Sequence, residues 1–112
     1  MQDVVVSKTY KAEDVWEAVA GCGFAGLNYW INFAELDSWL KPCDITLTHT
    51  AKDGEDLVKT TITPDQLGEA VAKVMNRKLT HCGNYPVDVE DYDSCFADLV
   101  LQTAIFDDII FG

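Results

Sequence analysis

The sequence predicts an α+β fold: one compact domain over residues 1–112, with an antiparallel sheet of three to four strands and about three helices packed mainly on one face. The length of 112 residues is near the usual size of a single domain. A hydrophobic fraction of 48% and an aromatic fraction of 11% are enough to build a core. Strand-like and helix-like stretches follow in the order β-α-β-β-β-α-α, and this partial segregation favours helices on one face of the sheet.

The first two predicted elements lie within residues 4–20. Val4 to Thr9 is rich in β-branched residues and partly alternates, which predicts a first strand. Ala12 to Ala20 shows helical spacing, with Val15 and Val19 on its apolar face. Gly21-Cys22-Gly23 is expected to end this helix.

Residues 27–36 form the stretch that is hardest to assign. It is aromatic and β-prone, so we expect a strand. Large apolar side chains fall on both faces: Tyr29, Ile31 and Phe33 on one, and Trp30, Ala34 and Leu36 on the other. A strand covered on both sides, or a helix, would account for this pattern.

A β-hairpin is predicted from residues 44–63. Asp44 to Thr50 alternates strictly, with Ile45, Leu47 and His49 opposite the threonines. Asp53-Gly54 is a strong hairpin signal, and Leu57 to Thr63 returns as the next strand.

The following helix has a well-marked start. Thr63 can cap it, Pro64 suits the first helical position, and Gln66 completes a capping box. The side chains expected to be buried share one helical stripe: Leu67, Ala70, Val71 and Val74, extended by Leu79.

A loop over residues 81–90 then leads to a last helix, expected from a cap at Asp93 to about Phe106. This helix is apolar over so much of its circumference that it should be sandwiched in the core. Asp98 falls within its first two turns, where a carboxylate suits the helix dipole. Ile109-Ile110-Phe111 should dock back onto the domain, because a free apolar end would invite aggregation.

The four cysteines are widely spread and none forms a C-x-x-C pair. Met1-Gln2-Asp3 has an acid where a secretory signal has bases, so we expect a cytoplasm. There cysteine is usually a small buried hydrophobe, which fits Cys43 and Cys95, whereas Cys22 could be more exposed.

The charge is strongly one-sided, with a formal net value of −11. Such a surface repels phosphate backbones and anionic membranes, so we expect no direct nucleic-acid or membrane partner. Instead it attracts a basic protein or a cation, although acidity can also serve solubility alone. No Lys or Arg follows Lys78, whereas acids continue to the end of the chain. The candidate partner-binding residues are Asp88, Glu90, Asp91, Asp93, Asp107 and Asp108.

Metal and catalytic motifs are weak. Asp88-x-Glu90-Asp91-x-Asp93 offers hard oxygen ligands but lacks EF-hand spacing, and His81-Cys82 with His49 lacks the paired ligands of a zinc site. No nucleophile has a local catalytic signature. Residues 21–26 have the glycine density of a phosphate loop but follow a helix, which favours a simple turn. We therefore expect no enzyme activity, no catalytic residue, no metal and no cofactor.

The first half of the chain is rich in aromatic residues, including Trp16, Trp30 and Trp39. Core packing is the favoured interpretation. Partial exposure as an interface anchor is the alternative, because aromatic residues dominate binding hot spots.

One resemblance concerns the end of the chain. The pattern Asp91-x-Asp93-x-Cys95-x-Ala97-Asp98-x-Val100-Leu101-Gln102-x-Ala104-x-Phe106, closing on Ile110-Phe111-Gly112, resembles small uncharacterised proteins encoded by bacteriophages and prophages of Gram-positive bacteria. Ala12-Glu13-Asp14-Val15 after a strand and Thr63-Pro64-Asp65 before a helix are also similar. The resemblance implies a phage source and action in a host bacterial cytoplasm, and carries no catalytic residue.

The leading functional hypothesis is therefore an acidic phage protein that binds and inhibits a host defence protein or nucleic-acid-binding complex, of the anti-CRISPR or anti-restriction type, by charge complementarity. One alternative is a virion assembly or structural protein, which could form a homo-oligomer. Another is a protein that sequesters a small molecule or nucleotide.

Overall fold

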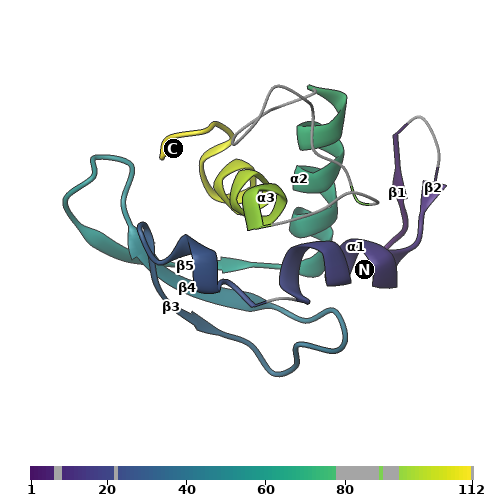
Figure 1. Cartoon of the computed structure of the whole chain (residues 1–112), viewed down its shortest axis with the longest axis horizontal. Coiled ribbons are helices and arrows are strands. Elements are labelled where there is room, and N and C mark those ends of the chain that lie inside the picture. Colours follow the sequence, from purple (N-terminus) through teal and green to yellow (C-terminus); the bar gives the residue numbers. More distant parts are fainter. Residues whose placement is uncertain (7–8, 22, 78–88, 90–93, 112) are drawn as a thin grey trace.

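The computed structural model describes the chain except residues 7–8, 22, 78–88, 90–93 and 112. It confirms the α+β prediction. Across the described residues, helices α1 (Ala12–Ala20), α2 (Pro64–Asn76) and α3 (Ser94–Phe106) gather on one side of a three-stranded antiparallel sheet (Figure 1). The other face of that sheet carries no helix in the described part of the chain, so it is open to solvent.

The predicted first strand is two short strands. β1 (Val4–Val5) and β2 (Thr9–Tyr10) pair antiparallel as a ribbon of their own, apart from the main sheet (Figure 1). Val4 is buried against α2, whereas Val5 is 66% exposed. The stretch predicted as one strand therefore contributes two short strands that pair with each other.

The main sheet has the order β3-β4-β5, formed by Ile31–Glu35, Ile45–Thr50 and Leu57–Ile62. Its inner face is built by alternate residues of β4, since Ile45, Leu47 and His49 are buried. The predicted hairpin between β4 and β5 is confirmed. Gly54 takes φ +81° in the turn, and the Asp53 carboxylate accepts hydrogen bonds from two following backbone N–H groups.

β3 differs from its prediction in length and in burial. Residues 25–27 form a 3₁₀ turn, η1 (Ala25–Leu27), and the strand begins only at Ile31. A register shift between Ile31 and Phe33 places Ile31 opposite His49 on the inner face and Phe33 opposite Thr48 on the open face. The strand is therefore not covered on both sides, and Phe33 is 58% exposed.

α1 has the predicted bounds, and the carboxylate of Asp3 accepts a hydrogen bond from its first residue, Ala12, at 3.0 Å. α2 begins at the predicted capping box: the Thr63 hydroxyl accepts from the Gln66 N–H, and the Gln66 side chain accepts from the Thr63 N–H. The predicted stripe Leu67, Ala70, Val71 and Val74 is buried, while Leu79 lies outside the described residues.

α3 is the central helix, as predicted, and residues 96–103 are all buried. The predicted cap, Asp93, lies outside the described residues. The final segment docks back: the backbone N–H groups of Ile110 and Phe111 each donate to the Gln102 side-chain oxygen at 2.8 Å. In the described part of the chain, no helix is both long and apolar enough to cross a membrane.

Candidate functional site

Two of the six predicted partner-binding acids can be placed, Asp107 and Asp108. Both are exposed and directly follow α3. Asp88, Glu90, Asp91 and Asp93 lie outside the described residues.

Asp107 contacts two basic side chains in the structure, although no Lys or Arg follows Lys78 in the sequence. Its Oδ1 lies 3.1 Å from Lys73 Nζ and 3.5 Å from Arg77 Nη2, both on α2. The hydrogen bond and charge of Lys73, and then the charge of Arg77, hold the pKa of the Asp107 carboxyl below its usual value. Asp107 also ends α3 with φ 54°, a left-handed conformation that Asp tolerates better than most residues. Part of its charge is thus compensated within the protein.

Acid is spread over the whole described surface and is not confined to the C-terminal third. Of the Asp and Glu residues that the structure describes, every one is exposed except Asp98. Groups of acids lie on α1, on the β4–β5 turn, beside β3 and between β1 and α2. The surface therefore presents negative charge in several directions.

Asp98 is the exception: it lies in the second turn of α3, as predicted, but its carboxylate is buried in a hydrogen-bonded network. It is 1% exposed, and its Oδ1 accepts hydrogen bonds at 2.8 Å from Trp30 Nε1 and from Gln102 Nε2. The Tyr29 hydroxyl donates to the other carboxylate oxygen. Burial, and then the hydrogen bond and charge of Asp98, raise the pKa of Tyr29 well above its usual value. This arrangement holds η1, α3 and the start of β3 together.

Gln102 links Asp98 to the final segment. Its amide nitrogen donates both to Asp98 and to the Phe111 carbonyl, the latter at 2.7 Å. The Phe111 ring stacks on Trp30, with 5.7 Å between ring centroids. The buried polar network is therefore structural, because every described group in it positions another part of the core.

His49 is also a structural residue. It is buried, with Nδ1 2.8 Å from the Thr50 carbonyl and Nε2 2.8 Å from the Thr60 hydroxyl. Both ring nitrogens are engaged, so His49 does not fit the zinc site considered from the sequence. Its candidate partners His81 and Cys82, like Asp88, lie outside the described residues. Among the residues that are described, no three metal-ligating side chains gather.

One of the described cysteines, Cys95, departs from its prediction. Cys95 is disulfide-bonded, whereas we expected a free thiol in the core. Cys43 is free and half-buried, and its Sγ lies 3.3 Å from the Ser38 carbonyl. Disulfides persist mainly in oxidising compartments, so the Cys95 bond is an argument against the expected cytoplasm.

The three tryptophans divide between the two predicted roles. Trp16 and Trp30 are core residues, 2% and 1% exposed. Trp39 is 42% exposed and lies in the connection between β3 and β4. Its ring and that of Phe33 border a hollow of about 550 Å³, which we call the Phe33–Trp39 hollow, lined also by Glu35, Asp37, Asp44 and Thr46.

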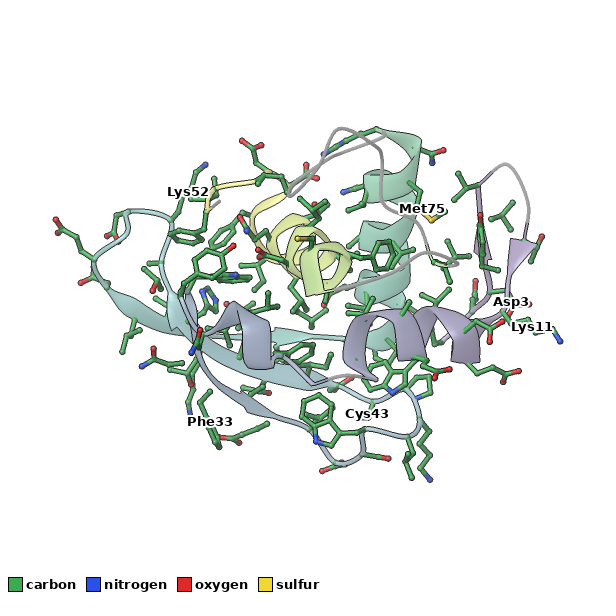
Figure 2. The ribbon with its side chains drawn as sticks, in the orientation of Figure 1. Asp3, Lys11, Phe33, Cys43, Lys52 and Met75 are labelled. Atoms are coloured by element: carbon green, nitrogen blue, oxygen red, sulfur yellow. The ribbon has the colours of Figure 1, made fainter. Side chains whose placement is uncertain are left out.

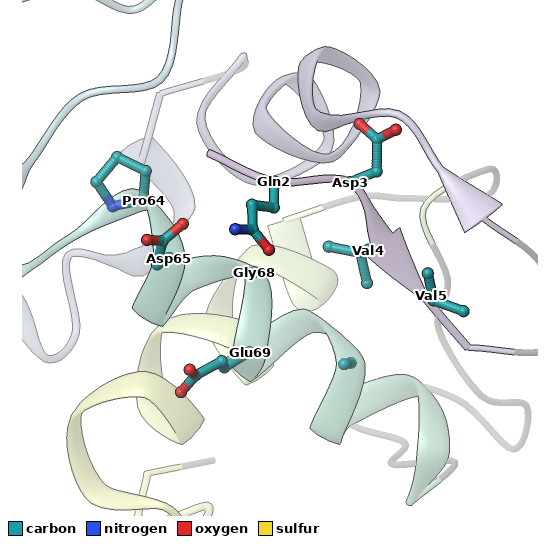
Figure 3. Close-up of a pocket in the computed structure, with 9 residues that line it drawn as sticks. Gln2, Asp3, Val4, Val5, Pro64, Asp65, Gly68 and Glu69 are labelled. Atoms are coloured by element: carbon teal, nitrogen blue, oxygen red, sulfur yellow. The ribbon is translucent and has the colours of Figure 1, made fainter.

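A second, smaller hollow lies between β1 and α2, with a volume of about 380 Å³ (Figure 3). The carboxylates of Asp3, Asp65 and Glu69 line it, while Val4 and Gly68 form its floor. Phosphate groups are repelled by such a lining, so the charge of this hollow opposes nucleotide binding.

No protein-family model, no curated protein and no solved structure matches the chain. The function is therefore argued from charge, exposure and geometry alone.

Proposed function

We propose that the protein binds a basic host protein that handles nucleic acid, and inhibits it by occupying its basic groove. The observation that carries this proposal is the net charge of −11 combined with the exposure of all described carboxylates but one. A surface of this kind attracts the same basic grooves that bind phosphate backbones, and steers association with them. An inhibitor of a host defence complex, of the anti-CRISPR or anti-restriction type, would use this chemistry.

Two features support binding over catalysis. The buried polar groups Asp98, Gln102 and His49 serve the core, and none of them lines the two hollows described above. The exposed groups are carboxylates and aromatic rings, which recognise protein surfaces. The phage source and the action in a host bacterial cytoplasm belong to the same proposal and rest on the sequence resemblance.

Affinity capture from the lysate of a Gram-positive bacterium tests the proposal. The tagged full chain should retain a basic nucleic-acid-binding protein at low salt. Added duplex DNA and about 0.5 M NaCl should both release it, because they compete for or screen the same charges. Recovery of no basic protein, or of one that duplex DNA does not displace, would sink the proposal.

The same capture tests the compartment. If the protein acts in a reducing cytoplasm, the partner should be retained equally with and without dithiothreitol, although the reductant acts on the Cys95 disulfide. Loss of the partner under reducing conditions would instead favour an oxidising compartment.

A virion assembly role is the second candidate, favoured by the exposed apolar side chains of the open sheet face. Phe33 and Leu57 are 58% and 56% exposed there, and β3 is an edge strand. Unpaired edges of this kind can pair with further copies. Light scattering after size-exclusion chromatography separates the candidates, since rings or tubes fit assembly and a monomer fits the inhibitor.

A further inference from the structure

We propose that the Phe33–Trp39 hollow is the docking site for an extended, Arg- or Lys-bearing segment of the protein partner. The inference rests on the proposed function, because it names the surface of this chain that would meet a basic partner. Four observations carry it: exposed aromatic rings, a preformed loop, uncompensated acid and a free strand edge.

The hollow presents two large aromatic side chains to solvent. Phe33 and Trp39 are 58% and 42% exposed, and in Figure 2 Phe33 points away from the helices, below the sheet. Leu40, next to Trp39, is 95% exposed. Aromatic rings exposed together beside a hollow are the side chains that dominate binding energy at protein interfaces, and their faces also attract Arg and Lys.

The backbone of β3 directs the Phe33 side chain to the open face of the sheet. In a regular strand Ile31, Phe33 and Glu35 would share one face. The register shift after Ile31 sends Ile31 to the core and both Phe33 and Glu35 to the open face, opposite Thr48 and Thr46. Bulges commonly re-aim a side chain in this way at the edge of a sheet.

The loop that carries Trp39 is held in place from the core. Trp16 Nε1 donates to the Trp39 carbonyl at 2.9 Å, and Cys43 Sγ lies 3.3 Å from the Ser38 carbonyl. The Phe24 ring meets the Trp39 ring edge to face, with centroids 5.3 Å apart. A preformed loop loses little conformational entropy when a partner binds, which favours affinity.

The charge of the hollow specifies the partner's chemistry. Glu35, Asp37 and Asp44 line it, and no basic side chain among the described residues does. In the described part of the chain, no hydrogen bond or ion pair uses these three carboxylates. Lys41 on the same loop and Lys59 on the open sheet face lie outside the lining. A cationic side chain is therefore the complement that this hollow lacks.

The edge position of β3 specifies the partner's conformation. β3 pairs with β4 on one side only, within the described residues. An extended segment can add to such an edge through its backbone while its alternate side chains enter the neighbouring hollow. A strand-like segment with Arg or Lys at every second position fits both the edge of β3 and the three carboxylates of the hollow.

Nuclear magnetic resonance of the ¹⁵N-labelled full chain tests the proposal, with an acetylated Arg-Val-Arg-Val-Arg-Val amide as the probe. Trp39 reports directly, since its ring is exposed while the indole N–H groups of Trp16 and Trp30 are hydrogen-bonded in the core. The Trp39→Phe variant identifies its signal. The probe should shift the Trp39 indole signal and the amides of residues 31–35, and a Glu-Val probe should shift neither. Shifts confined to other regions would overturn the assignment.

Charge reversals of matched number locate the site. Glu35→Lys, Asp37→Lys and Asp44→Lys together should weaken probe binding about tenfold or more, because they remove its counter-charges. Glu17→Lys, Glu55→Lys and Glu69→Lys change the net charge equally at exposed positions elsewhere and should have a small effect. Unchanged Trp16 and Trp30 signals verify the fold of both variants. Equal weakening in the two variants would show only diffuse attraction.

A separate variant tests the aromatic contribution. Phe33→Ala leaves every charge in place and should also weaken probe binding, since Phe33 is exposed and supplies contact area and not core packing. Unaltered binding would show that the Phe33 ring does not contribute to the site.

Analytical ultracentrifugation tests the identity of the bound segment. Self-association of the chain through β3 would show that the occupant is a second copy of this chain and not a segment of another protein.

The capture experiment separates this inference from the proposed function. A basic partner retained by the Glu35, Asp37 and Asp44 variant but lost by the Glu17, Glu55 and Glu69 variant would leave the function standing and refute the surface. Probe binding at Trp39 without capture of any basic protein would refute the function and leave the hollow as a basic-peptide site.

Discussion

Two buried polar residues of α3, Asp98 and Thr103, stand in opposite relation to their surroundings. The Asp98 carboxylate accepts hydrogen bonds from Tyr29, Trp30 and Gln102. Thr103 is 3% exposed, and its hydroxyl has no hydrogen-bond partner among the described groups. Because an unpaired buried polar group costs free energy and a paired one does not, the two positions should respond to substitution with opposite sign.

Asp98→Asn should lower the free energy of unfolding by about 2 kcal/mol, because hydrogen bonds to a charged acceptor become hydrogen bonds to a neutral one. The substitution keeps the side-chain volume and one accepting oxygen for Trp30 and Gln102, but it places an amide N–H where the second carboxylate oxygen accepts from Tyr29. Urea denaturation followed by tryptophan fluorescence measures the change. Glu69→Gln, an equally conservative change at an exposed position, is the control. An Asp98→Asn protein as stable as its parent would show that the network contributes no net stability.

Thr103→Val should raise the free energy of unfolding by about 1 kcal/mol, because a methyl group replaces a hydroxyl that has no partner. The reverse change on the same helix, Val100→Thr, should lower it, since Val100 is fully buried. Both are measured by the same denaturation. A loss of stability in Thr103→Val would mean that the hydroxyl is already satisfied.

Elements were predictable wherever local chemistry decides them. The bounds of α1 and the start of α2 follow from spacing and from the capping box, and the β4–β5 hairpin follows from Asp53-Gly54. These signals act between residues close in sequence, so no partner element is needed to interpret them.

The capping box gives the prediction at this scale. Thr63→Ala should lower the free energy of unfolding by about 1 kcal/mol, because the first turn of α2 loses the acceptor for the Gln66 N–H. Thr63→Ser keeps that acceptor and should change little. Thermal and urea denaturation of the pair measure the difference. Equal losses in the two variants would assign the effect to the methyl group and not to the cap.

The features that sequence reasoning missed depend on distant partners. The helix dipole alone does not reveal the buried network of Asp98, for which the i, i+4 spacing of Asp98 and Gln102 on an apolar helix is the available sign. The exposure of Phe33 depends on register with β4, which a single strand does not reveal. The acids of the Phe33–Trp39 hollow are brought together only by the fold, because Glu35 lies at the end of β3 and Asp44 just before β4.

At the scale of the whole molecule, the excess of negative charge sets the balance between solubility and stability. Exposed carboxylates on several faces repel one another in the compact state. The contacts of Asp107 with Lys73 and Arg77 offset this only locally. Salt, which screens both effects, should therefore act mainly on the repulsion.

The thermal unfolding midpoint should rise as NaCl increases from about 20 to about 300 mM, because screening weakens the self-repulsion of a chain of net charge −11. Calorimetry or circular dichroism measures it. In the Glu17→Lys, Glu55→Lys and Glu69→Lys variant, three reversals raise the net charge by six, to −5, and the rise should be smaller. A midpoint that falls with salt would mean that attractive pairs outweigh repulsion.

The register shift in β3 lets the strand carry one residue more than its partner without changing which side chains face outward. Ile31 lies opposite His49 and Phe33 opposite Thr48, so Asn32 has no position of its own in the pairing with β4. Deleting Asn32 would leave Ile31 toward the core and Phe33 on the open face, because the shortened strand would alternate regularly in the same register. The bulge thus makes the recognition surface tolerant of a one-residue insertion or deletion at this point, whereas the same change elsewhere in β3 would exchange the two faces of the strand.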